Sequence, residues 1–273
     1  MPASIFRPTG RRPTLQAVGA AVFIRDVYTE DEFRTALTEF EARSTGSATP
    51  QGFGVSIKAP ITVSSPFVIP STLPGFVVEG NNVTITPTAT ITEVFLIKTF
   101  FVIISRVYVQ TLVAANAPDA MVVCDPTSTT TGGILQDSRI VGSKALIQIV
   151  SGAGHAGWSV LNNQYLATNA TSSGSSISLL AGDGHFVSGN TIVATGAVNA
   201  VEVNGGNCRI VANDTNNDAI VVGASGGTST VSGNIMQGGA ITTSASAGNN
   251  TIFGNTDCGT LTTHTTDAVG LNT

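Results

Sequence analysis

Short apolar runs alternate with turn residues along most of the chain. From Gly52 onward, segments rich in β-branched residues, such as "GVSIKA", "ITVSS" and "VTITP", are separated by Pro, Gly or Asn. No later stretch has sustained helical spacing. Runs of this length bounded by turn residues are typical of β-strands. The pattern predicts an all-β fold, with the strands spread over residues 47–263.

One segment near the N-terminus departs from this pattern and predicts a helix. Residues 21–27 have the composition of a strand, and Thr29 and Glu32 then have the spacing of a capping box. The apolar residues that follow fall on one face at helical spacing: Phe33, Ala36, Leu37 and Phe40. Gly46 ends the segment. We therefore expect a strand and an amphipathic helix over residues 21–46.

A short phrase recurs through the second half of the chain. "HFVSGNTIV" (residues 185–193) returns as "STVSGNIMQ" (residues 229–237), with looser copies between and around them. One asparagine anchors each copy: Asn163, Asn190, Asn213, Asn234 and Asn255. The steps between them are 27, 23, 21 and 21 residues. Three positions before each anchor stands a β-branched aliphatic residue: Val160, Val187, Ile210, Val231 and Ile252.

A period in the twenties without helices predicts one coil of a parallel β-solenoid, repeated along an axis. Equivalent residues of successive coils then lie about 4.8 Å apart. The asparagines become a ladder of side-chain amides, and the aliphatic residues become a column in the core. Extending the register upstream makes Asp137, and then Arg106, the next anchors.

A second strand is expected after each anchor. Its inward positions are Ile177, Val201, Ile220, Ile241 and Leu261. Alternation then turns another set outward: Ala200, Glu202, Ala219, Val221, Ala240 and Thr242. This outer face is small and nearly uncharged. It fits either a neutral solvated sheet or a surface packed against identical copies, and we favour packing against copies.

These features resemble the pectate-lyase-like superfamily of right-handed parallel β-helices, and within it the trimeric spike proteins of bacteriophages. The resemblance is carried by the "VSGN"-type coils from Ile134 to Asp257 and by the strand and helix at residues 21–43. It implies a single-stranded right-handed parallel β-helix whose open N-terminal end is closed by the helix. The same fold hosts lyases, hydrolases, adhesins and virion parts, so the resemblance specifies the fold more than the function.

Composition and charge narrow the classes of partner. Only 11% of the residues are charged and the net charge is −5. Residues 145–273 carry six acidic groups and a single basic one, Arg209, so the basic stripe of a nucleic-acid binder is missing. The most apolar stretch, residues 93–109, is interrupted by Lys98 and Arg106 and is not expected to insert in a membrane. Cys124, Cys208 and Cys258 are dispersed and predict free thiols.

The two ends of the chain are expected to lie outside the β-helix. Residues 1–20 contain three prolines and Arg7, Arg11 and Arg12, which predicts an extended arm that attaches to a particle or, alternatively, a disordered terminus. Residues 264–273 are expected to form a C-terminal tail. The first residues lack the apolar core of a signal peptide, so we expect synthesis in the host cytoplasm.

Candidate chemistry is sparse. Glycoside cleavage needs two carboxyl groups about 5–10 Å apart, yet Glu202 and Asp214 are expected to stack on residues without carboxylates. Asp214 and Asp218 in "NDTNND" are candidate cation ligands, with a structural turn as the competing interpretation. Trp158 is a candidate glycan contact, with core packing as its alternative. We expect no catalytic residue, metal or cofactor.

Together these inferences predict a non-enzymatic structural protein of a bacteriophage virion. It is expected to be a homotrimeric spike that joins other virion proteins through its arm and contacts polysaccharide on the host surface as a tail spike. One alternative is a capsid decoration or head spike protein. A polysaccharide lyase or hydrolase is another, from a different functional class.

Overall fold

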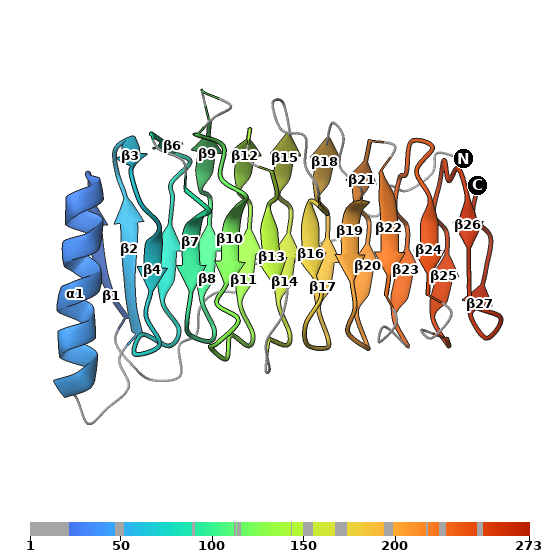
Figure 1. The fold of residues 1–273 in the computed structure, drawn as a ribbon, viewed down its shortest axis with the longest axis horizontal. Helices are drawn as coiled ribbons and strands as arrows, with labels where there is room; N and C mark the ends of the chain where they lie inside the picture. The colour runs from blue at the N-terminus through green and yellow to red at the C-terminus, as the bar shows by residue number, and fades with distance from the viewer. Residues whose placement is uncertain are drawn as a thin grey trace, which may run out of the picture.

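The computed structural model describes most of the chain as short strands. The described residues are 22–46, 52–88, 91–111, 113, 116–142, 144–149, 155–166, 174–193, 199–216, 218–223, 228–244 and 248–273. Within them, the helix α1 (Glu30–Gly46) lies at one end of a row of coils (Figure 1). Arg7, Arg11 and Arg12, with the predicted arm, fall outside the described residues.

The described strands form three sheets in which every pairing is parallel. Sheet A contains β1 (Val22–Val27), β2 (Gly52–Ile57), β5 (Val77–Glu79), β8 (Ile103–Ser105), β11 (Ile134–Gln136), β14 (Ser159–Leu161), β17 (Phe186–Ser188), β20 (Arg209–Val211), β23 (Thr230–Ser232), β25 (Thr251–Phe253) and β27 (Ala268–Val269). Sheet B contains β3 (Ile61–Val63), β6 (Thr84–Pro87), β9 (Tyr108–Gln110), β12 (Arg139–Val141), β15 (Gln164–Leu166), β18 (Thr191–Val193) and β21 (Asp214–Thr215). Sheet C contains β4 (Phe67–Ile69), β7 (Glu93–Ile97), β10 (Ala120–Cys124), β13 (Ile147–Ile149), β16 (Ile177–Leu179), β19 (Asn199–Val203), β22 (Ala219–Val222), β24 (Ile241–Thr243) and β26 (Leu261–Thr262).

The chain visits the three sheets in a fixed rotation. From β3 to β22 it passes from sheet B to sheet C to sheet A and back to sheet B, adding one strand to each sheet per coil. Each coil therefore lies beside the one before it, as Figure 1 shows. The all-β class is confirmed, and the three parallel sheets are consistent with a parallel β-helix.

The corners between the sheets differ in length. From β8 to β21, two residues join each strand of sheet A to the next strand of sheet B, as Gly189 and Asn190 join β17 to β18. The connections from sheet B to sheet C are longer and vary from coil to coil. The repeat length of the sequence therefore varies because the other connections differ in length, while the corner between sheets A and B stays constant.

A single hydrophobic core runs along the inside of the stack. It extends from Val27 and the buried face of α1 to Ile252, near the last coils. The predicted core column occupies the middle positions of β14, β17, β20, β23 and β25, and each of its members is fully buried: Val160, Val187, Ile210, Val231 and Ile252. Burial of one large aliphatic side chain contributes about 1.5–3 kcal/mol, so this column is a major part of the stabilising free energy.

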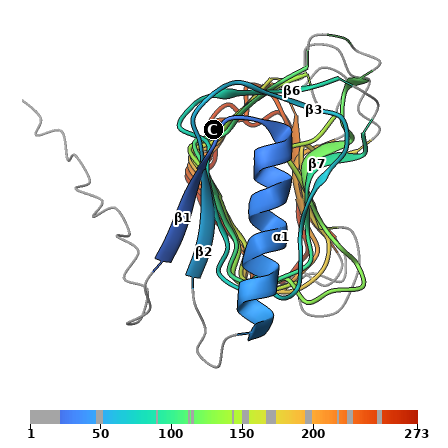
Figure 2. The ribbon, with the colours of Figure 1, turned by 90° about the vertical axis from the view of Figure 1, so that its left-hand side faces the viewer.

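Helix α1 covers the N-terminal end of the core (Figure 2). Phe33 stacks on Phe67 with ring centroids 4.0 Å apart, and Phe40 stacks on Phe53 at 4.9 Å. The Glu32 N–H donates to Thr29 Oγ1 over 3.2 Å, as a capping box requires. The Glu32 carboxylate, however, accepts the N–H of Tyr28 rather than that of Thr29, at 2.6 Å. The helix therefore begins where the sequence predicts, but the Glu32 side chain bonds to the residue before Thr29 instead of to Thr29 itself.

Three details differ from the sequence-based expectations. The last ten residues are not a separate tail, because β27 pairs with β25 and extends sheet A. Ala200 is fully buried rather than outward, because β19 and β22 shift register between Asn199 and Val201. Leu261 keeps its predicted register but is 36% exposed, because β26 is the last strand of sheet C.

The core column generates the first prediction. Val187→Asp places an unpaired charge among aliphatic side chains, which costs more than the few kcal/mol by which a domain of this kind is stable. We expect the variant to be insoluble or to lack the β-sheet signal in circular dichroism. Ser188→Asp, one residue further on the same strand and half-exposed, is the matched control and should fold. A folded Val187→Asp protein would contradict the assigned register.

Candidate functional site

The five predicted ladder residues lie in consecutive coils, at the corner between sheets A and B. They are at most 2% exposed, and we call them the asparagine ladder: Asn163, Asn190, Asn213, Asn234 and Asn255. Asn163 donates to Asn190 Oδ1 from both its Nδ2 and its backbone N–H, each over 3.0 Å. Its Nδ2 also donates to the Leu135 carbonyl of the preceding coil at 3.0 Å.

The same bonds recur at every later step of the asparagine ladder. Each amide therefore uses both donor hydrogens and its acceptor oxygen inside the protein. This satisfies the buried polar groups at the corner and links every coil to the next. The ladder is a structural device with no polar atom left for a ligand.

The hydrogen-bonded column extends beyond the asparagine ladder in both directions. At the C-terminal end, Asn272 Oδ1 accepts from Asn255 Nδ2 at 2.8 Å. At the other end, the Ser138 N–H donates to Asn163 Oδ1 at 3.0 Å. The Ser138 hydroxyl in turn accepts the N–H of Val107 at 3.2 Å. In this coil a serine side chain therefore takes the place that an asparagine side chain has in the later coils.

The upstream anchors expected from the sequence are wrong by one residue. Pairing of β11 with β14 places Leu135 beside Val160, which puts Ser138, not Asp137, in the position of Asn163. Asp137 is exposed and precedes the column. Arg106 is likewise exposed and stands one position before Val107. The charged side chains thus stay in solvent, where their hydration is retained.

The residue before each step of the asparagine ladder has a left-handed backbone. The angle φ is +55° at Asn162, +69° at Gly189, +56° at Ala212 and +64° at both Gly233 and Gly254. This conformation turns the chain from sheet A into sheet B, and glycine adopts it without steric strain. The recurring "SGN" therefore combines a glycine that makes the corner with an asparagine that bonds the coils together.

A second polar column, which sequence reasoning missed, stands one position before the strands of sheet A and is buried except at its last residue. Its members in successive coils are His185, Cys208, Ser229, Asn250 and Asp267. The Cys208 N–H donates to Ser229 Oγ at 3.2 Å, the Ser229 N–H to Asn250 Oδ1 at 2.9 Å, and the Asn250 N–H to Asp267 Oδ1 at 2.9 Å. The residue type changes in each coil, so only the position relative to the strand marks this column.

Burial keeps the two chemically versatile members of this column uncharged. It lowers the pKa of His185, whose Nε2 donates to the Ala181 carbonyl at 3.0 Å and whose Nδ1 accepts the Trp158 N–H at 3.3 Å. Burial also raises the pKa of the Cys208 thiol, which donates to the Gly205 carbonyl at 3.2 Å. Both groups are thus neutral hydrogen-bonding partners near pH 7 rather than an acid–base pair or a thiolate nucleophile.

The candidate cation ligands are used within the fold. Asp214 opens β21, and its Oδ1 accepts from Gln237 Nε2 at 2.7 Å. Its neighbours in register are Thr191 and Ile235, so no carboxylate stacks on it. Asp218 is 9% exposed. No group of three or more His, Cys, Asp or Glu residues that could hold a metal ion occurs in the described part of the chain.

Trp158 is not available to a glycan. The side chain is fully buried, and its Nε1 donates to the Thr130 carbonyl at 2.5 Å. A Cβ atom on Gly133 would lie 2.4 Å from the indole ring, so a glycine in the preceding coil makes room for it. The predicted glycan contact is wrong for this residue, and its alternative, core packing, is what the structure has.

Carboxylates along the C-terminal half bond to adjacent coils. Asp183 Oδ1 accepts the Gly206 N–H at 2.8 Å, and Glu202 Oε2 accepts from Ser175 Oγ at 2.5 Å. The residues in register with Glu202 are Ser178 and Val221. These are the neighbours that the sequence predicts for Glu202, and neither of them carries a carboxyl group; glycoside cleavage requires two carboxyl groups about 5–10 Å apart.

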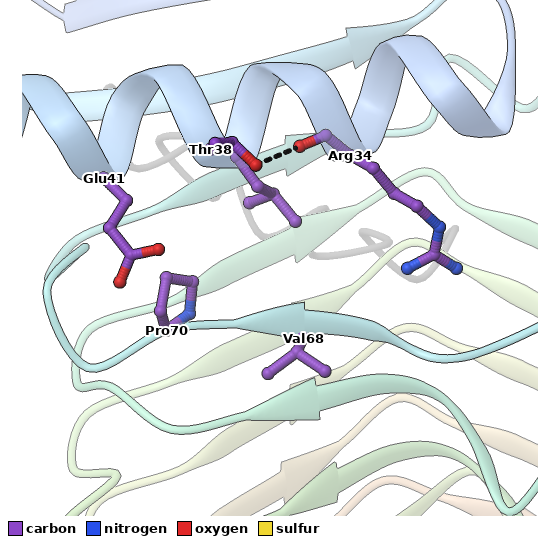
Figure 3. Close-up of a pocket in the computed structure, with 6 residues that line it drawn as sticks. Arg34, Thr38, Glu41, Val68 and Pro70 are labelled. Carbon is purple, nitrogen blue, oxygen red and sulfur yellow. Dashed lines mark hydrogen bonds between the residues drawn. The ribbon is translucent and has the colours of Figure 1, made fainter.

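Two grooves flank α1. A groove of about 270 Å³ lies between the helix and β4, as Figure 3 shows, and is lined by Arg34, Leu37, Thr38, Glu41, Val68 and Pro70. Arg34 is held by Glu30 at 2.6 Å and by the Pro66 carbonyl at 3.0 Å. Glu41 accepts from the Thr72 hydroxyl at 3.1 Å. The charged groups of this groove are therefore engaged in attaching the helix to the first coil.

The asparagine ladder generates a second prediction. Asn213→Ala removes the acceptor for the Asn190 amide groups and the donor to the Val187 carbonyl, leaving buried polar groups without partners. We expect the free energy of unfolding to fall by about 2–4 kcal/mol, measured by denaturant titration. Asn216→Ala, an exposed asparagine three residues away, should change stability by less than about 0.5 kcal/mol. If Asn213→Ala lowers the free energy of unfolding no more than Asn216→Ala does, the ladder adds no stability.

The end of the second column generates a pH prediction. Burial tends to raise the pKa of Asp267, but hydrogen bonds from the Thr243 hydroxyl and from Asn250 and His264 hold it below its ordinary value of 3.8. Because the folded-state pKa is depressed, this stabilisation is present above the unfolded-state pKa and is lost as the pH falls through the folded-state value. Asp267→Asn should thus be less stable than the native protein at pH 7, with the difference shrinking below about pH 4. If denaturant titrations give the same difference in unfolding free energy at every pH, the depressed pKa of Asp267 is refuted.

Comparisons with known proteins add little to this description. A family model described as the alpha-2-macroglobulin family matches residues 29–92, less than a quarter of the chain, which include α1 and the first coils but not the asparagine ladder. No curated protein matches the chain, and no solved structure does. Among the described residues, no helix has the length and apolar content needed to cross a membrane.

Proposed function

We propose that this chain is a non-enzymatic structural protein of a bacteriophage virion, a trimeric spike built as a right-handed parallel β-helix of the pectate-lyase-like type. The observation that carries the proposal is the continuous bonding of one coil to the next. The column from Ser138 to Asn272 is hydrogen-bonded at every step, and the backbone pairings of three sheets run beside it. Such a rod resists bending and local opening, which suits a part that projects from a particle.

A non-enzymatic role is supported by how the polar side chains are used. Asp183, Glu202, Asp214 and Asp267 each accept a hydrogen bond from a neighbouring coil. His185 and Cys208 are buried and uncharged near neutral pH. Groups committed to holding coils together are poorly placed to exchange protons with a substrate, because catalytic groups must reach the reacting atoms.

Attachment is assigned to the N-terminal end. Helix α1 closes this end of the core (Figure 2), and two grooves flank it. Arg7, Arg11 and Arg12 in the preceding segment supply charge for contact with another virion protein. The remaining coils then project outward, where contact with host-surface polysaccharide would make the chain a tail spike. A head spike or capsid decoration protein is the alternative placement.

Two measurements test the proposal. The purified chain should have a native mass three times 27.8 kDa. In particles assembled with a peptide-tagged chain, a gold-labelled antibody should mark either the tail or the capsid surface in electron micrographs, which separates the two placements. Particles that never carry the tag would overturn the virion assignment.

The enzymatic alternative has its own test. Incubation of the purified chain with capsular or lipopolysaccharide glycans should release no oligosaccharide above a heat-inactivated control. Release of sugar that Glu202→Gln or Asp214→Asn abolishes would replace the spike proposal with a polysaccharide lyase or hydrolase. A contaminating enzyme is excluded when the variant that loses activity is purified in the same way and keeps its β-sheet signal.

A further inference from the structure

Two columns of outward apolar residues run along the N-terminal half of the solenoid. On sheet C, Val68, Leu96 and Val123 are in register in β4, β7 and β10. On sheet A, Val77, Ile103 and Ile134 are in register in β5, β8 and β11. Val68 is 38% exposed, and Leu96, Val123, Ile103 and Ile134 are half-exposed, whereas Val77, at the N-terminal end of the sheet A column, is 6% exposed. Outward positions of a sheet facing water are ordinarily polar, so both columns need an explanation.

Both columns become polar in the same coil. In β13 the sheet C column continues with Gln148, and in β14 the sheet A column continues with Ser159. These strands follow one another along the chain and belong to one coil. One coil further on, the sheet A column has a single exposed aromatic residue, Phe186, which is 37% exposed. The two columns are apolar over the same three coils and are interrupted in the same coil, which indicates one continuous surface that wraps around the corner between sheets C and A.

An exposed aromatic pair occupies the corner of the middle coil. Phe100 and Phe101 follow β7 and precede β8, are 39% and 57% exposed, and meet edge to face with ring centroids 5.4 Å apart. We call these two residues, with the two apolar columns, the corner surface. Large exposed aromatics at the centre of an apolar patch are typical of the residues that contribute most to protein–protein association.

The backbone at Phe101 is strained. Its φ is +58°, a conformation that is unusual for a bulky side chain. Every coil from β5 to β25 has a positive φ at this corner, two residues before its sheet A strand. The other residues at this position are Gly75, Gly132, Gly157, Gly184, Asn207, Thr228 and Asn249. The corner thus normally takes glycine, asparagine or a small residue, and Phe101 is the exception.

Packing within the chain does not account for this exception. The Phe101 ring lies against Gly132, where a Cβ would be 2.5 Å from the ring, yet more than half of the side chain remains in solvent. A strained, exposed aromatic residue is a destabilising choice for the isolated chain, and strain of this kind is typical of functional positions. The aromatic pair is accounted for if another molecule covers it.

The pattern of the corner surface identifies that molecule. Its apolar residues recur once per coil on two adjacent sheets, at the spacing of about 4.8 Å set by parallel strand pairing. A partner must present apolar groups at the same spacing over three coils to cover them, and a second parallel copy of this chain does so. The six column residues are uncharged, so parallel copies would not repel one another there.

We infer that the corner surface is where copies of this chain pack against each other, with the sheet A column of one copy against the sheet C column of the next. Three such head-to-tail contacts close a ring, and the Phe100–Phe101 pairs then meet near its axis. The inference rests on the trimeric spike proposed above and assigns the residues that form the trimer. It places the contact in the N-terminal half, rather than on the Ala219–Thr242 face expected from the sequence.

The test uses a substitution with opposite effects on folding and association. Phe101→Gly relieves the backbone strain, so the isolated chain should be at least as resistant to denaturant as the native one. The same change removes the central contact, so the concentration for half-assembly in sedimentation velocity should rise at least about tenfold. Ala212→Gly relieves similar strain at φ +56°, far along the chain from the corner surface, and should leave assembly unchanged.

A second pair of variants uses positions in the same outward column. Leu96→Lys places like charges in the contact and should yield monomers, whereas Gln148→Lys, in the polar coil, should stay assembled. Unchanged assembly in both Phe101→Gly and Leu96→Lys overturns the inference. A native chain that is monomeric overturns it too, even if particles carry the tag and the virion assignment survives. A chain that assembles through Phe101 but never appears on particles supports the corner surface and refutes only the virion role.

Discussion

Stacking parallel strands places like positions of successive coils about 4.8 Å apart, and every inward polar group must therefore find its partner in an adjacent coil. The asparagine ladder meets this requirement with one side chain per coil, which accepts from the coil before it and donates to the coils on both sides. The same bonds fix the register of the β-strands on either side. The core column depends on that register, because a slip of one residue would turn its aliphatic side chains outward.

The sequence was sufficient to predict the coils that contain the asparagine ladder, because one residue type recurs three positions after an aliphatic one. It failed upstream, where Ser138 replaces the amide and the charged Asp137 resembles the missing anchor. It also failed for the column from His185 to Asp267, in which each coil uses a different polar residue. The members of that column share a position in the coil rather than a residue type, so a search for recurring residues does not detect them.

The candidate site was harder to predict than the fold because it depends on which side chains are exposed to solvent. Trp158 looked suitable for a sugar in the sequence, but Gly133 leaves room for its ring inside the coil. Phe100 and Phe101 belong to the most apolar stretch of the sequence, but they lie at a corner where their side chains face solvent. The interior of the stacked coils is apolar from end to end, whereas the outer surface changes along the stack, so the outer surface carries the information about partners.

The two-residue corner between sheets A and B leaves no room for additional chain, since a single inserted residue would separate an asparagine from its neighbours in the ladder. The connections from sheet B to sheet C and from sheet C to sheet A carry no such constraint and already differ in length between coils. Insertions during evolution should therefore accumulate along those two edges of the stack. Loops that recognise new targets would appear there while the third edge, and the shape of the molecule, stayed the same.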